Sequence, residues 1–141
     1  MATPKGYEPD TRITAAAKTI GRSTGAIIDI TDDPARAVTG ANAIYTDVWA
    51  SMGQEAEAAE RKEIFAPYQV NQALFALAAP DAFFMHCLPA HRGEEVTADV
   101  MDSPRSIVFD QAENRMHVQK AILLMLLGSG MGRVSARSNH A

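Results

Sequence analysis

The chain has 141 residues, of which 47% are hydrophobic and 21% charged, and its formal net charge is −4. These values predict one folded domain with an apolar core and argue against intrinsic disorder. The acidic balance excludes a basic surface of the kind that binds nucleic acid, and the longest apolar run, 121–127, is far too short to span a membrane. Cys87 is the single cysteine, and the N-terminal residues lack the apolar core of a signal peptide, so we expect a cytoplasmic protein without disulfides.

Hydrophobic spacing and capping residues predict short strands that alternate with helices. The predicted helices span residues 11–22, 34–38, 55–64, 71–79, 97–101 and 110–127, and the predicted strands span residues 26–30, 41–45, 82–85 and 106–109. Asp32, Asp33 and Thr97 are expected helix caps, and Gly25 is expected to end the first helix. This alternation predicts an α/β fold with a parallel sheet flanked by helices.

Polar and reactive side chains gather where three of these strands end, at residues 47–53, 86–93 and 110–115. Ligands of parallel α/β sheets bind outside the carboxyl ends of the strands, so a site is expected there. Asp47 could hold a cationic ligand group, or it could form a local turn with its own backbone. Both interpretations of Asp47 stay open from the residue pattern alone.

Cys87 has three possible roles. It could be a nucleophile with His86 or His91 as its base, or a metal ligand in a set with His86, His91 and His117. The third interpretation is a small buried residue at a strand end. Adjacent residues of an extended segment point to opposite sides, which argues against the nucleophile, and the usual paired spacings of metal ligands are absent from the sequence, which argues against the metal site.

Arg115 lies near the expected start of the last helix, where a cation is unfavourable for the helix dipole. A guanidinium in that place suits an anion or a carbonyl oxygen that gains charge. The alternative is a salt bridge to Asp110 or Glu113. The glutamates after Cys87, together with Arg92, are typical of a solvated loop.

Three segments in this order resemble ornithine carbamoyltransferase over nearly the whole chain. They are Tyr-Thr-Asp-Val-Trp at 45–49 followed by Ser-Met-Gly-Gln-Glu at 51–55, His-Cys-Leu-Pro at 86–89 within 85–96, and Phe-Asp-Gln-Ala-Glu-Asn-Arg at 109–115. The resemblance is to the C-terminal, ornithine-binding part of that family. It implies a partial Rossmann-like domain at residues 1–127, followed by a polar tail at residues 128–141.

The resemblance implies transfer of a carbamoyl group from carbamoyl phosphate to the side-chain amine of ornithine, giving citrulline and phosphate, without metal or organic cofactor. Asp47 would orient the ornithine amino group, and Ser51 and Met52 would complete that pocket. Cys87 and Leu88 would line the junction between ornithine and carbamoyl phosphate. Arg115 would bind the carbamoyl oxygen, a role that needs a positioned donor where negative charge develops.

The family's Ser-Thr-Arg-Thr phosphate loop, its His-Pro motif and its Asp-Gly-Asn-Asn segment have no match in this sequence. We therefore expect full activity to require a missing N-terminal half, and the isolated chain to be marginally stable or prone to aggregate. The family is a homotrimer, whereas the assembly of this chain stays open. A non-catalytic module that binds an amino acid or a partner chain is the second hypothesis, and a Cys/His metal-binding domain ranks below both.

Overall fold

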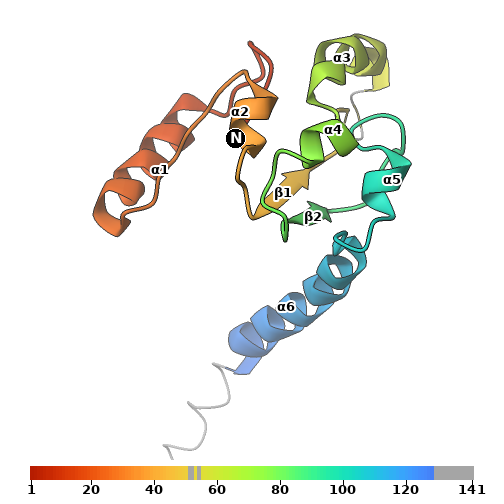
Figure 1. Ribbon diagram of the computed structural model, residues 1–141. Coiled ribbons are helices and arrows are strands. Elements are labelled where there is room, and N and C mark those ends of the chain that lie inside the picture. The colour runs from red at the N-terminus through yellow and green to blue at the C-terminus, as the bar shows by residue number, and fades with distance from the viewer. Residues whose placement is uncertain (51–52, 54, 129–141) are drawn as a thin grey trace, which may run out of the picture.

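The computed structural model describes residues 1–50, 53 and 55–128, and its centre is a parallel pair of strands (Figure 1). The strands are β1 (Ala43–Thr46) and β2 (Phe83–His86), which pair with Thr46 opposite His86. The helical elements are α1 (Thr11–Thr24), α2 (Pro34–Val38), η1 (Glu55–Glu57), α3 (Ala58–Phe65), η2 (Ala66–Tyr68), α4 (Gln72–Phe75), α5 (Ala98–Met101) and α6 (Val108–Gly128). The expected α/β class with a parallel sheet flanked by helices is confirmed.

Capping residues account for the ends of the first two helices. The Asp10 carboxylate accepts hydrogen bonds from the backbone N–H groups of Arg12 and Ile13 at the start of α1, and Gly25 ends that helix with φ 80°. Asp33 caps α2 through the N–H of Arg36, as predicted. Asp32 lies outside the cap, and Thr97 occupies the N-cap position of α5 without a side-chain cap bond.

The strand predicted at residues 26–30 is wrong. Ile27 is 91% exposed, and the pairing in this region is one isolated bridge between Ala2 and Thr31. A β-branched run becomes a strand only where a second strand accepts its backbone hydrogen bonds. Within the described residues, no second strand lies alongside this segment.

The strand predicted at residues 106–109 is also wrong, for a related reason. Ser106 forms a single bridge with Phe84, and the chain turns into α6 at Val108. The bridge satisfies the N–H of Phe84 and the N–H of Ile107, through bonds of 2.9 and 3.0 Å. From Val108 onward the backbone is helical, so α6 begins two residues earlier than expected.

The core lies on one face of the sheet. Ile44 and Phe84 point to this face and are 7% and 0% exposed, whereas Tyr45 and Phe83 on the other face are 55% and 50% exposed. The buried partners come from the connecting segments and α4 to α6 and include Val70, Phe75, Val96, Val100, Met101 and Val108. Figure 1 shows α1 and α6 extending away from this core. Within the described ranges, no helix is long and apolar enough to cross a membrane.

Candidate functional site

The carboxyl ends of β1 and β2 lie side by side, since the two strands are parallel and end in register. Asp47 and Cys87 therefore leave the sheet at the same edge. The Cys87 thiol donates a hydrogen bond to Asp47 Oδ1 at 3.0 Å, and the backbone N–H of Val48 donates to the same oxygen at 2.7 Å. Two of the residues that the sequence singled out are thus in direct contact.

The surroundings of Cys87 favour the neutral thiol. Burial raises the pKa of Cys87 above the ordinary thiol value of 9.0, and the hydrogen bond to Asp47 raises it further. Burial, with the neighbouring Cys87, likewise raises the pKa of Tyr45 on the same edge. A thiol that stays protonated at neutral pH is a hydrogen-bond donor rather than a nucleophile. Neither proposed base bonds to the thiol: the His86 ring is engaged by Glu95 and the Leu88 N–H, and the His91 ring lies 3.8 Å from Glu95, whereas the thiol itself bonds to Asp47.

The start of α6 reaches the same edge through Gln111. Its side-chain oxygen accepts a hydrogen bond from the His86 backbone N–H at 3.1 Å, which ties α6 to the end of β2. Sequence reasoning gave Gln111 no role of its own. Arg115 is exposed and lies one helical turn beyond Gln111, so the two side chains share a face of α6.

Two expectations about Arg115 are corrected. Because α6 begins at Val108, Arg115 is about two turns inside the helix and not beside its free N–H groups. The alternative, a salt bridge to Asp110 or Glu113, does not form. Glu113 lies 3.5 Å from His117, and no described residue makes a hydrogen bond or ion pair with the Arg115 side chain.

Of the remaining predicted site residues, the structure describes Leu88 but not Ser51 and Met52. Leu88 is half-buried, packs against the hydrophobic core and has a positive φ of 57°. Ser51 and Met52 lie outside the described residues. The predicted boundary at residue 127 also stays a prediction, because residues 129–141 are not described.

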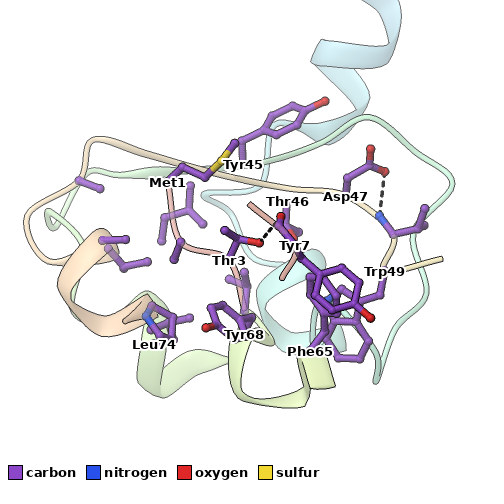
Figure 2. Close-up of a pocket in the computed structure, with 18 of the residues that line it drawn as sticks. Met1, Thr3, Tyr7, Tyr45, Thr46, Asp47, Trp49, Phe65, Tyr68 and Leu74 are labelled. Carbon is purple, nitrogen blue, oxygen red and sulfur yellow. Dashed lines mark hydrogen bonds between the residues drawn. The ribbon is translucent and has the colours of Figure 1, made fainter. Parts of the chain in front are cut away.

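A cavity of about 710 Å³ opens beside Asp47 (Figure 2). Its lining combines the end of β1 with an aromatic cluster in which Phe65 lies 4.9 Å from Tyr7 and 6.3 Å from Trp49, measured between ring centroids. Arg61 donates to the backbone oxygen of Trp49 at 3.3 Å. Cys87, Leu88 and Arg115 do not line this cavity, so it adjoins the Asp47–Cys87 contact without containing it.

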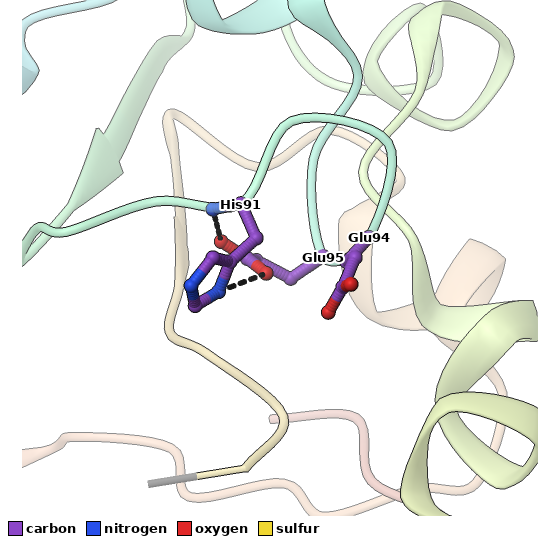
Figure 3. Close-up of side chains that lie close together, drawn as sticks. All are labelled: His91, Glu94 and Glu95. Carbon is purple, nitrogen blue, oxygen red and sulfur yellow. Dashed lines mark hydrogen bonds and ion pairs between the residues drawn. The ribbon is translucent and has the colours of Figure 1, made fainter. Parts of the chain in front are cut away.

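The structure does not gather the four metal ligands considered from sequence. Cys87 bonds to Asp47, the His86 ring to Glu95, and His117 lies beside Glu113. It places a different set together, His91, Glu94 and Glu95, with ligand atoms within 4.8 Å of one another (Figure 3). These side chains could hold a metal ion by residue type, although Glu94 already pairs with Lys62 at 3.2 Å.

Sequence reasoning missed the buried pair of His86 and Glu95. Both side chains are 0% exposed, and His86 Nε2 lies 3.1 Å from Glu95 Oε1. Glu95 is therefore no part of a solvated loop. Arg92 does fit that interpretation, because it is exposed and pairs with Asp102 at 2.7 Å. No local pattern marks which of two adjacent glutamates is buried.

Comparisons with known proteins show the family to which the chain belongs. The model of the family described as "Aspartate/ornithine carbamoyltransferase, Asp/Orn binding domain" matches residues 1–126. A curated relative, the ornithine carbamoyltransferase of Thermococcus kodakarensis, is 59% identical over 128 residues, which cover 91% of this chain and 41% of the relative. The chain thus spans about two fifths of the length of that relative.

Solved structures give the same result. The ornithine carbamoyltransferase of Pyrococcus furiosus superposes with a TM-score of 0.82 at 60% identity, covering 87% of this chain and 39% of that one. The anabolic enzyme of Campylobacter jejuni gives a TM-score of 0.86 at 32% identity, covering 91% and 42%. With its sequence and fold both matched, the chain belongs to the aspartate/ornithine carbamoyltransferase family and corresponds to its Asp/Orn-binding domain.

Proposed function

We propose that this chain supplies the ornithine side of an ornithine carbamoyltransferase site. The observation that carries the proposal is the hydrogen bond between Cys87 and Asp47 at the adjoining carboxyl ends of β1 and β2. It brings an acceptor for an ammonium group and a neutral donor to one edge, next to the face of α6 that bears Arg115.

In the proposed reaction, the side-chain nitrogen of ornithine attacks the carbonyl carbon of carbamoyl phosphate. The carbon–oxygen bond to phosphate breaks, phosphate leaves with the bonding electrons, and the nitrogen loses a proton to give citrulline. Asp47 orients the ornithine amino group, and Ser51 and Met52 complete its pocket. Positioning of this kind converts a bimolecular step into an effectively unimolecular one and accounts for much of the rate enhancement.

The carbamoyl end requires donors for the oxygen that gains negative charge. Arg115 supplies a permanent cation, and Cys87 and Leu88 line the junction between the two substrates. Donors fixed in advance stabilise the transition state because they need no reorganisation during the reaction. The phosphate ligands come from a second polypeptide segment that carries the family's Ser-Thr-Arg-Thr loop. On the family resemblance alone, we extend the proposal to a cytoplasmic homotrimer as the parent assembly.

The test is citrulline formation from ornithine and carbamoyl phosphate by the purified chain, alone and mixed with a separately expressed N-terminal half of a relative. Activity in the mixture only, lost in Asp47→Asn and kept in Asp81→Asn, supports the proposal. Asp81 is an exposed carboxylate near the opposite end of β2, so it matches the chemical change away from the site. If the two halves are folded and associated in the mixture and still form no citrulline, the proposal is rejected.

A second candidate is a non-catalytic module that binds a partner chain. The large exposed apolar side chains of α6, Leu123 to Leu127, favour this alternative because such surface usually marks an interaction site. Calorimetric titration with ornithine separates the two candidates. Binding that disappears in Asp47→Asn supports the enzyme interpretation, and tight association with a partner without ornithine binding supports the module.

A further inference from the structure

We propose that Glu95 is a positioning residue for the Asp47–Cys87 site, acting through the buried ring of His86 on the backbone of Leu88. The catalytic meaning of this inference rests on the proposed function. The contacts that carry it join Glu95, His86 and Leu88 and place Cys87 against Asp47, and they can be tested without carbamoyl transfer.

The hydrogen bonds of His86 define its protonation. The backbone N–H of Leu88 donates to His86 Nδ1 at 2.9 Å, so this nitrogen carries no proton. The neutral ring then holds its proton on Nε2, which lies 3.1 Å from Glu95 Oε1 and donates to it. The tautomer follows from the hydrogen-bond network, and it makes the ring a link between Glu95 and the Leu88 backbone.

The Glu95 carboxylate is buried and bonded in a way that fits this role. Its side chain is 0% exposed, and Oε1 also accepts the backbone N–H of His91 at 2.6 Å. Oε2 has no hydrogen-bond partner among the described residues, and its nearest cationic candidate is His91 Nδ1 at 3.8 Å (Figure 3). Burying a carboxylate is unfavourable unless its bonds compensate, so the two donors on Oε1 account for its presence.

The segment that Glu95 supports has an unusual backbone. Leu88 is the one non-glycine residue with a positive φ in the described part of the chain. A side chain disfavours that conformation, which persists where surrounding contacts hold it. The bond from the Leu88 N–H to His86 is such a contact. Cys87 lies between these two residues and points to the opposite side from His86, toward Asp47.

Alkylation with iodoacetamide reports on this placement, because Cys87 is the single cysteine. We compare wild type with Glu95→Gln, which keeps an acceptor oxygen, and Glu95→Leu, which removes it. Glu94→Leu is the matched control, since it makes the same change one residue away and breaks only the ion pair with Lys62. Rates are measured across pH, because burial raises the pKa of the Cys87 thiol, and its neighbours Asp47 and Tyr45 shift that pKa further, upward and downward respectively.

We expect Glu95→Leu to react at least about tenfold faster than wild type, with a lower midpoint pH, because loss of the acceptor frees the segment from Asp47. Glu95→Gln and Glu94→Leu should stay within about twofold, since both keep the acceptor at residue 95. A wild-type rate in Glu95→Leu overturns the proposal. So does an equal acceleration in Glu95→Gln or Glu94→Leu.

A measurement on the wild-type chain decides the matter if Glu95→Leu does not fold by circular dichroism. Nitrogen-15 shifts of the imidazoles report the His86 tautomer, and hydrogen exchange reports the Leu88 amide. A bare Nδ1 and a protected amide support the proposal, and a protonated Nδ1 or an unprotected amide overturns it. Neither readout involves citrulline, so failure here is distinct from failure of the proposed function.

Discussion

The Cys87 thiol is held by one neighbouring carboxylate, and this contact leads to a prediction about its acidity. Asp47→Asn should lower the pKa of Cys87, because the variant removes the negative charge that favours the protonated thiol. Burial, the larger cause, remains, so the pKa should fall only part of the way. The midpoint of alkylation rate against pH measures it. An unchanged midpoint, or one that moves equally in Asp81→Asn, would contradict the assignment of the hydrogen bond.

The proposed roles of Asp47 and Arg115 predict large losses of rate in an active assembly with the missing half. Asp47→Ala and Arg115→Ala should each reduce the rate of citrulline formation by at least about a hundredfold, the scale for an oriented charge-stabilising group. Arg36→Ala is the control for charge loss, because Arg36 is exposed, pairs with Asp29 and is not among the proposed site residues. Near-wild-type rates in both site variants would contradict the roles proposed for Asp47 and Arg115.

The two strands differ from the other β-branched runs because they have each other as partners. β1 and β2 pair over four residues, and one face of the pair packs on the core. Residues 26–30 and 106–109 have similar local propensity, yet each obtains a single bridge. Helices were easier to locate from sequence, because the caps at Asp33 and Gly25 act within a few residues of the chain.

Adjacent phenylalanines on β2 give a matched test of this packing. Phe84→Ala should lower the free energy of unfolding by about 3–5 kcal/mol, since a fully buried ring leaves a cavity. Phe83→Ala, at a side chain that is 50% exposed, should cost less than about 1 kcal/mol. Urea unfolding measures both. Equal costs would mean that the outer face of the sheet is covered in solution.

The whole molecule exposes an unusual amount of apolar surface. In α6 alone, Leu124, Met125 and Leu127 are 73%, 75% and 72% exposed, and Ile13 and Ile20 of α1 are 68% and 62% exposed. Surface of this kind favours association, because burial of apolar area is the main driving force for contact between proteins. It agrees with the expectation that the isolated chain is marginal or prone to aggregate.

This surface predicts concentration-dependent self-association of the purified chain. Replacing both Leu124 and Leu127 with lysine should shift the sedimentation distribution toward the monomer, because charge on α6 opposes burial of that face. A matched pair of lysines at Glu60 and Glu63, on the exposed side of α3, serves as the control. A monomeric wild-type chain at high concentration would contradict the prediction.

The sequence predicted the fold class, the two central strands, the strand ends at which Asp47 and Cys87 lie, and the helices starting near residues 11 and 34, whereas the helix predicted at 71–79 is confined to Gln72–Phe75 and α6 begins at Val108. The helices and strands follow from caps and apolar spacing, which act within a few residues of the chain. The strand ends of the site were marked by three motifs that resemble a known family. The burial of Glu95 against His86, the bond by which Gln111 joins α6 to β2, and the choice of the β-branched runs that pair became visible in the folded chain alone. Each of these depends on a partner distant in the chain or on the fold of a loop, and local residue patterns carry no information about such partners.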